Sequence, residues 1–464
     1  MGENVIGTTK ISLNQVNFIS SQPEGQRLDL KSKRIAPAKL SRSLSAFANS
    51  DGGELFVGLE DDRTWDGFET EEDANGILDV VSQIFPLADF VQVEFLAADA
   101  RQGLVLKISI ARTPDIKRSS DDKVYVRFGA QNLKKEDAQS LRQLEYAKGV
   151  FSFEDQTIQG SLDEVENSVS IIHFSLNIIP TPEPKTWLRK QKLIVNEKAT
   201  VAANVLFADE PQVNLPKSGI KVYRYKTAAA NGTRDTLAFD PIAIEGNCYA
   251  LIEKTVSITK EVAQDVPKLG VAGLEKILYP AEAIHEIITN AVIHRDYSVN
   301  DEIHIRIFDN RIEIFSPGRL PGYVTPQNIL QERFARNPKI VRILNKFPNP
   351  PNKDVGEGLN TAFEKMRELK LRDPIVQETD TGVMVILVHE LLASPEEIIK
   401  GYLMEHGQIN NSTAREICRE GSENKIKRIF ERMMDANIIE KVPDRRGRAT
   451  AYQLRPHQIT GDQQ

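Results

Sequence analysis

The 464-residue chain lacks several features that would assign it to a familiar class of protein. Its only two cysteines, Cys248 and Cys418, cannot build a disulfide framework, and no zinc-ligand spacing occurs. No run of 18 apolar residues is present, so no membrane span is expected. The polar start, MGENVIGTTKISLNQ, has no signal-peptide core, which makes the cytoplasm the expected compartment. The formal net charge of -7 excludes a general basic field, so any nucleic-acid site must be a local patch.

Hydrophobic patterning predicts an α+β, multidomain chain. Residues 24–145 read as strand, helix, strand, helix and further strands, typical of an α/β sandwich. The stretch 150–183 is polar and ends in PTPEP, which predicts a linker, and strands are expected around ANVLFAD and GIKVYRYK beyond it. The predicted domains are residues 1–148, 149–270 (linker and connector), 271–391 and 392–464.

The strongest local pattern is YPAEAIHEIITNAVIHRDYS, in which Glu282, Glu286 and Asn290 are spaced by four. This spacing places the two acids and the amide on one face of a helix. Further on, Gly356 and Gly358 precede another helical stretch, where backbone N–H groups can approach phosphate oxygens. The alternative interpretation of the polar stripe is a solvated helix face. The order of these elements favours a nucleotide site.

This constellation resembles the GHKL (Bergerat-type) ATP-binding domain, a two-layer α/β sandwich, in the branch of bacterial regulators with an AlbA-like N-terminal domain. The resemblance implies that Asn290 holds Mg²⁺ and that Glu286 activates the attacking water. It places Ser316 and Gly318 in the turn that meets adenine, and Gly356 and Gly358 in the phosphate-covering loop. Ser316 stands where the family usually has an aspartate, which leaves base recognition and fast hydrolysis open.

Four further residues are candidate nucleotide ligands. Arg295 and Asp296 follow the polar-stripe helix directly, and Arg336 and Asn337 lie in a lid-like stretch. For Arg336 and Asn337 the alternative is a loop that caps a helix. Nucleotide occupancy is expected to shift this lid, around residues 322–356.

A second candidate site lies near the N-terminus. Asp29 and Lys31 fall on the same side of a short strand, and Asp61 ends the next strand. Carboxylates that hold Mg²⁺ or Mn²⁺, beside a lysine, are the groups that metal-assisted phosphodiester cleavage requires. The spacing Asp-x-Lys is common by chance, and acids before a turn are often merely solvated.

The run from Glu24 to Asp61 resembles the Schlafen core, with its ANxxGGxLxxGxxD signature present as AFANSDGGELFVGLED. The resemblance implies an acidic trio, Glu24, Asp29 and Asp61, that cuts transfer RNA or other structured nucleic acid, with Asp29 in place of the usual glutamate. The same pattern also occurs in proteins regarded only as DNA-binding regulators. Arg127, in YVRFGAQN, is expected either to contact phosphate or to form a structural salt bridge.

The C-terminal region predicts three helices followed by a hairpin, which is a winged-helix pattern. In that motif the third helix enters the major groove and the wing touches the backbone. The cations on the third helix and the wing are therefore nucleic-acid-binding candidates: Lys425, Lys427, Arg428, Arg432, Arg445, Arg446 and Arg448. The alternative is a winged helix that contacts protein.

Taken together, the patterns and the two resemblances imply a cytoplasmic protein that uses ATP and Mg²⁺ (or Mn²⁺) and acts on DNA or RNA, and the GHKL resemblance implies a homodimer. One hypothesis is a metal-dependent nuclease gated by nucleotide and serving phage defence. A second is an ATP-sensing transcriptional regulator without nuclease activity. A third is an ATPase with a protein partner. Whether the chain is an enzyme, as a nuclease or a slow ATPase, stays open at this stage.

Overall fold

The computed structural model describes residues 6–99, 101–160, 162–178, 183–264, 267–270, 273–276, 279–351, 359–369, 371–388, 395–418, 422–443 and 450–455. The chain forms two compact units, of which the first comprises residues 1–369 and 373–388 and the second residues 370–372 and 389–464. In the described residues, none of the helices has the length and apolar character needed to cross a bilayer.

The N-terminal domain is built on a five-stranded mixed sheet with the order β1-β4-β5-β3-β2. β1 is parallel to β4 and β2 to β3, whereas β5 runs antiparallel to both of its neighbours. The strands are β1 (Thr8–Ile11), β2 (Leu28–Lys31), β3 (Gly53–Val57), β4 (Val91–Ala98) and β5 (Leu104–Ile110). The helices are α1 (Leu13–Ser21), α2 (Pro37–Ala48) and α3 (Asn75–Ile84).

Alternation along β3 gives this sheet two apolar faces. Leu55 and Val57 belong to the core formed with α2 and α3, whereas Phe56 belongs to the core that includes Val16 of α1. Successive side chains of a strand point to opposite faces, so the alternation places helices on both sides of the sheet. A hairpin, β6 (Val124–Phe128) and β7 (Gln131–Lys135), and helix α4 (Ala138–Lys148) complete the domain.

Much of the predicted linker is helical. It contains the 3-10 turn η2 (Phe153–Asp155), α5 (Leu162–Glu166) and α6 (Val169–Ile178), followed by α7 (Pro184–Lys190), β8 (Ile194–Val195), β9 (Lys198–Ala199) and α8 (Val201–Phe207). The strand predicted at ANVLFAD was wrong, because α8 occupies that position. All seven residues of α8 are buried, and the Thr200 side chain accepts from Ala203 N to cap the helix. A short, wholly buried apolar run carries no period that separates strand from helix.

The central domain is a two-layer sandwich with a six-stranded sheet of order β11-β10-β14-β15-β17-β16. β10 and β14 are parallel, and every other neighbouring pair is antiparallel. The strands are β10 (Ile220–Arg224), β11 (Ile242–Ile244), β14 (Ile303–Ile307), β15 (Arg311–Pro317), β16 (Ile375–Glu378) and β17 (Gly382–Val388), with a separate hairpin β12 (Pro267–Gly270) and β13 (Gly273–Lys276).

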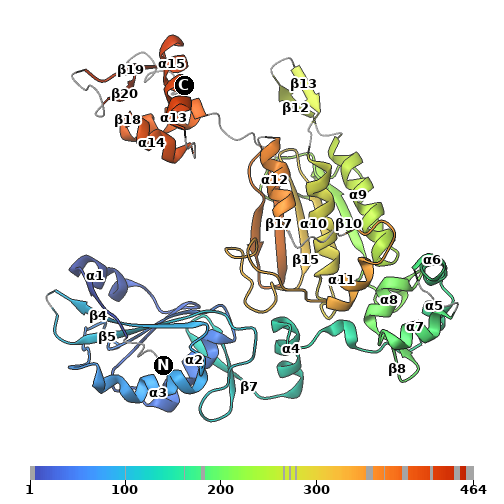
Figure 1. The fold of residues 1–464 in the computed structure, drawn as a ribbon, viewed down its shortest axis with the longest axis horizontal. Helices are drawn as coiled ribbons and strands as arrows, with labels where there is room; N and C mark the ends of the chain where they lie inside the picture. The colour runs from blue at the N-terminus through green and yellow to red at the C-terminus, as the bar shows by residue number, and fades with distance from the viewer. Residues whose placement is uncertain are drawn as a thin grey trace. The chain divides into compact units, whose positions relative to one another are not determined.

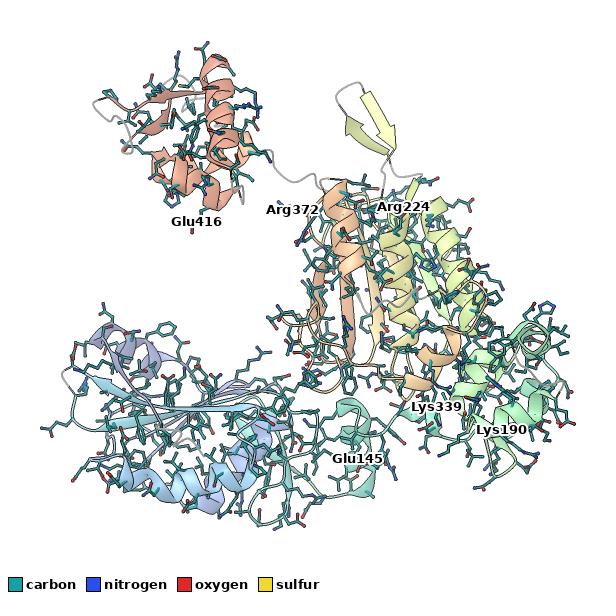
Figure 2. All side chains as sticks on the ribbon, in the orientation of Figure 1. Glu145, Lys190, Arg224, Lys339, Arg372 and Glu416 are labelled. Atoms are coloured by element: carbon teal, nitrogen blue, oxygen red, sulfur yellow. The ribbon has the colours of Figure 1, made fainter. Side chains whose placement is uncertain are left out.

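Helices α9 (Cys248–Gln264), α10 (Ala281–Ile293) and α12 (Asn360–Glu368) cover one face of this sheet, and the shorter α11 (Pro338–Leu344) lies at its end (Figure 1). The alternating isoleucines of β14 are buried, so one face of this strand packs into the core, and β14 lies between β10 and β15 in the sheet. The strand predicted at GIKVYRYK is present as β10, and its last residue, Arg224, is labelled in Figure 2. β10 and β11 join this sheet although the sequence suggested a separate connector up to residue 270.

The second unit has its own apolar core, which includes Ile426, Phe430 and Met433. Its helices are α13 (Pro395–His406), α14 (Asn411–Ile417) and α15 (Glu423–Asp435). Its strands, β18 (Ile409–Asn410), β19 (Ile439–Lys441) and β20 (Ala451–Leu454), form an antiparallel sheet of order β18-β20-β19. Three helices with a terminal hairpin are the elements expected from the sequence, and the winged-helix assignment stays a prediction.

Candidate functional site

A cavity of about 690 Å³ opens between α10 and the strands β15 and β17 of the central domain. Its walls are mostly apolar, with side chains such as Ile287, Ile314 and Val385, and Asn290 and Ser316 add polar groups. Ligand clefts of this kind usually measure about 300–1,000 Å³ and combine apolar walls with a few polar groups. The cavity therefore has the size and composition of a small-molecule site.

The polar stripe of α10 borders this cavity. Asn290 lines it and donates from Nδ2 to Glu286 Oε1 at 2.8 Å. Glu286 and Asn290 are both partly exposed, while Ile287 and Ile288 between them are buried. Glu282, one turn earlier, is exposed. The spacing of four thus brings the carboxylate and the amide into direct contact.

The turn after β15 approaches α10 closely. Gly318 has φ +97°, and a Cβ at this position would collide with Cβ of Asp296. Ser316 donates from Oγ to the carbonyl of Ala291 at 2.7 Å. Ser316 and Gly318 both line the cavity, as the sequence pattern suggested for the base-binding turn.

Four of the predicted nucleotide ligands lie instead in a buried network beneath the cavity. Arg336 is 4% exposed and its NH1 forms an ion pair with Asp296 Oδ2 at 2.8 Å. Asn337 donates from Nδ2 to the carbonyls of Ile293 and Arg295 at 2.9 and 2.8 Å. These contacts fix the C-terminal end of α10 and explain the Arg-Asn pair without a ligand.

Arg295 is likewise a supporting residue. Its side chain is buried and donates to the backbone carbonyls of Lys217, Val299 and Asp301. Burial lowers the pKa of this guanidinium, although the neighbouring phenol and carboxylates oppose the shift. The contacts named above join Arg295, Asp296, Arg336 and Asn337 to other protein groups, and their role as direct nucleotide ligands stays a prediction.

The sequence patterns did not single out four polar or charged side chains that line the cavity: His294, Arg319, Glu332 and Arg333. His294 continues the spacing of four after Asn290, so the same periodicity could have found it. Gly356 and Gly358 lie outside the described residues.

In the N-terminal domain, Asp29, Lys31 and Glu24 come together at β2. Lys31 Nζ lies 2.7 Å from Asp29 Oδ1 and 3.6 Å from Glu24 Oε1. Asp29 Oδ2 accepts from Ser43 Oγ at 3.2 Å and from Arg127 NH1 at 3.3 Å. Asp29 is 1% exposed, so its carboxylate is buried and held on both oxygens.

Arg127 is also buried, and it forms a salt bridge with Asp29, which is the structural role expected from the sequence as the alternative to a phosphate contact. Its guanidinium donates to Asn132 Oδ1 at 2.8 Å and to the carbonyls of Gly25 and Leu28 at 3.0 and 3.3 Å. It also lies 4.8 Å from the ring centroid of Phe47. A guanidinium engaged on every side inside the fold is not positioned to meet a phosphate.

The predicted acidic trio does not assemble in the described part of the chain. Asp61 is exposed in the turn after β3. Among the described residues, no group of three or more histidine, cysteine, aspartate or glutamate side chains could hold a metal ion. Asp29 instead pairs with Lys31 and Arg127, and the metal set Glu24, Asp29 and Asp61 stays a prediction.

The AFANSDGG signature has a structural explanation in the same domain. Asn49 donates from Nδ2 to the carbonyls of Lys117 and Tyr125 at 2.7 and 2.9 Å, and its Oδ1 accepts from Lys117 N at 2.9 Å. The asparagine thus ties the end of α2 to β6. Gly52 has φ +68° and lies against the backbone of β5, where a Cβ would meet the carbonyl of Ile110.

The predicted cations of the third C-terminal helix lie on the surface of α15. Lys425, Lys427, Arg428 and Arg432 are all exposed. Lys427 pairs with Glu423 at 2.7 Å, and Arg432 pairs with Glu396 of α13. The wing residues Arg445, Arg446 and Arg448 lie outside the described residues.

Comparison with known proteins identifies two parts of the chain. Residues 24–136 match the family model described as "Schlafen, AlbA_2". Residues 300–387 match the family described as "Putative ATP-dependent DNA helicase recG C-terminal". This second match begins after α10, so Glu286 and Asn290 lie outside it. No curated protein matches the chain.

A solved structure also resembles the chain over most of its length. The crystal structure of the DIP2311 protein from Corynebacterium diphtheriae is 18% identical, covering 96% of this chain and 98% of that chain, with a TM-score of 0.41. The family matches agree with both resemblances inferred from the sequence. The chain is thus an α+β, multidomain protein with a Schlafen AlbA_2 domain at residues 24–136 and a domain of the ATPase-like recG C-terminal family at residues 300–387.

Proposed function

We propose that this chain binds ATP with Mg²⁺ in the cavity of the central domain, and that the bound nucleotide controls nucleic-acid binding by the same chain. The observation that carries the proposal is the cavity bordered by the Asn290–Glu286 pair on one side and by the Ser316–Gly318 turn on the other. The family match of residues 300–387 supports it.

The residues present fit a nucleotide and its cation. Because Asn290 Nδ2 donates to Glu286, the amide oxygen is the Asn290 atom that can ligate a cation. Glu286 is the neighbouring group able to accept a proton from water. When bound, the cation would offset the negative charge of the ATP phosphates.

Ser316 can serve base recognition in place of an aspartate. A hydroxyl has one hydrogen, and Ser316 Oγ directs it to the carbonyl of Ala291. The oxygen therefore offers lone pairs to a ligand, as an acceptor that suits the adenine amine. The carbonyl at the same position of guanine is itself an acceptor and would be repelled.

Calorimetric titration with ATP and Mg²⁺ tests the nucleotide site. Asn290→Ala is expected to weaken binding by roughly ten- to a hundred-fold, since it removes a charge-assisted contact. Asn231→Ala, at an exposed position in a loop, is the matched control and should bind like the wild type. Equal affinity of the Asn290 variant and the control would refute this site.

Base preference has its own test. The wild type should prefer ATP to GTP, and Ser316→Ala should reduce that preference by weakening ATP binding. A Ser316→Ala variant with an unchanged ATP-to-GTP ratio would contradict the role of Ser316.

For the N-terminal domain we propose nucleic-acid binding rather than cleavage. Asp29 is buried in ion pairs with Lys31 and Arg127, which compensate its charge. A carboxylate that is already paired with two cations is a poor ligand for a metal ion, and this supports binding rather than cleavage. Incubation with Mn²⁺ or Mg²⁺, with and without ATP, on tRNA, single strands and duplexes tests it. Cleavage by the wild type that is lost in Glu24→Ala would instead establish a nuclease.

A further inference from the structure

An arginine on the cavity wall is held by one carboxylate from each of two domains. Arg319, directly after Gly318, lines the cavity. Its NH2 donates to Glu378 Oε2 at 3.0 Å, at the end of β16, and also to Asp51 Oδ1. Asp51 belongs to the N-terminal domain, in the turn between α2 and β3. Both domains are parts of one compact unit.

The other oxygen of Asp51 faces the N-terminal site. Asp51 Oδ2 accepts from Gln26 Nε2 at 2.7 Å. Gln26 in turn holds the β6–β7 turn, because its Nε2 donates to the carbonyl of Arg127 at 3.2 Å and its Oε1 accepts from Gly129 N at 2.9 Å. Arg127 then pairs with Asp29 at 3.3 Å. A continuous chain of hydrogen bonds thus runs from the cavity wall to the buried acid of β2.

The junction is largely shielded from water. The side chains of Glu378 and Asp51 are 8% and 12% exposed. Arg112, at the end of β5, adds an ion pair with Glu378 at 2.9 Å and donates to the carbonyl of Leu320 at 2.7 Å. A buried charge that loses its partner raises the free energy of the folded chain. Movement of Arg319 therefore destabilises the positions of both carboxylates.

Asp51 and Arg319 stay ionised at neutral pH. Burial opposes ionisation of Asp51, but the hydrogen bond and charge of Arg319 outweigh it and leave the pKa of the carboxyl below its ordinary value. Burial likewise opposes the charge of Arg319, yet Glu378 and Asp51 hold its pKa above the ordinary value. The contact is therefore a persistent ion pair and not a pH switch.

We propose that Asp51 is the positioning residue that couples ligand occupancy of the cavity to the β6–β7 turn of the N-terminal domain. A ligand that displaces Arg319 leaves Asp51 Oδ1 without this partner, so the carboxylate can rotate and weaken the bond from Gln26 to Oδ2, which loosens the turn at Arg127 and Gly129. By linkage, a nucleic acid that orders this turn changes the affinity of the cavity for its ligand by the same factor. This coupling rests on the proposed nucleotide site.

The coupling can first be tested without any ligand. Asp51→Asn replaces one of the two carboxylate oxygens by an NH2 donor, so an acceptor oxygen can face Arg319 or Gln26 but not both. In the full chain, Asp51→Asn and Arg319→Gln should each make amide exchange at Gly129 roughly three- to ten-fold faster, as expected for loss of one hydrogen bond. Arg333→Gln, on the same wall but exposed, is the matched control and should leave Gly129 unchanged.

The double variant separates coupling from simple damage to either domain. If the contact transmits the effect, Asp51→Asn combined with Arg319→Gln should accelerate exchange no more than either change alone. The proposal would be overturned if the double variant multiplied the accelerations of the two single variants. It would also be overturned if Arg319→Gln left the exchange rate at Gly129 unchanged. Because this arm needs no ligand, it gives a result even if the chain does not bind ATP.

Addition of ATP and Mg²⁺ then tests the response to occupancy. The wild type should change its exchange at Gly129, and Asp51→Asn should lose most of that response while still binding ATP. Binding of ATP with no change at Gly129 in the wild type would overturn the coupling and leave the nucleotide site intact. Absence of ATP binding would refute the nucleotide site, with the ligand-free arm still deciding whether the contact couples the domains.

Discussion

At the scale of single residues, Gly318 shows how closely the cavity turn is fitted to α10. Its φ of +97° lies in the left-handed region, and no side chain fits because Cβ of Asp296 occupies the space. Asp296 cannot give way easily, since it is buried in its pair with Arg336. Glycine is therefore required here both by the backbone conformation and by the neighbouring side chain.

Gly318→Ala should lower the free energy of unfolding by about 2–4 kcal/mol, because overpacking adds to the cost of a left-handed non-glycine residue. Urea unfolding measures the change. Gly76→Ala is the control, because a Cβ at that helical position meets nothing within 4 Å. A loss in Gly318→Ala no larger than that of the control would contradict the steric argument.

At the scale of elements, α11 is capped from outside its own sequence. Glu154, in η2, accepts from the backbone N–H groups of Lys339 and Ile340 at 2.8 and 2.9 Å. Figure 2 labels Lys339 in the first turn of this helix. A carboxylate at a helix N-terminus satisfies unpaired donors and suits the helix dipole. The polar segment that the sequence predicts to be a linker thus anchors an element of the central domain.

Glu154 also predicts a pH dependence of stability. Burial raises the pKa of its carboxyl to about 7, although the two backbone N–H groups oppose the shift. A raised pKa means that the folded chain holds the proton more tightly than the unfolded chain. The contribution of Glu154 to stability is therefore present below its unfolded pKa and is lost as the pH rises toward 7.

Between pH 5 and 7.5 this contribution should fall by roughly 3 kcal/mol at most. Urea unfolding of the wild type and of Glu154→Gln at the two pH values measures it. The variant, which cannot titrate, should lose less stability over this interval. Parallel pH profiles for the two proteins would rule out a titrating Glu154.

At the scale of the whole molecule, the chain combines a net charge of -7 with cations gathered on α15 of the second unit. Lys425 and Arg428 are exposed there. An acidic protein binds nucleic acid only through such a local patch, and the affinity must then depend on salt through release of counterions.

Binding of the full chain to a mixed-sequence duplex should therefore weaken as salt increases. Arg428→Ala should make the slope of log affinity against log salt shallower by about one. Lys190→Ala, an exposed cation on α7, serves as the control. If both variants keep the wild-type slope, α15 does not contact the nucleic acid.

Much of the fold was predictable because its signals are local. The alternating isoleucines of β14 and the spacing of Glu286 and Asn290 each follow from a period that one segment contains by itself. α8 shows the limit of this approach, since its seven residues, six apolar ones and Asn204, are all buried and carry no period. Its helical form depends on burial from all sides and on the Thr200 cap.

The sequence by itself determined the α+β class, the polar face of α10 and the AFANSDGG turn, because side-chain periodicity and glycine backbone requirements act within a few residues. Only the tertiary structure decided that Arg127 and Arg336 are buried supports and that Arg319 reaches Asp51. It also decided that β10 and β11 belong to the central sheet. The physical reason is that desolvation and strand pairing depend on which distant surfaces meet, and no local pattern records that choice.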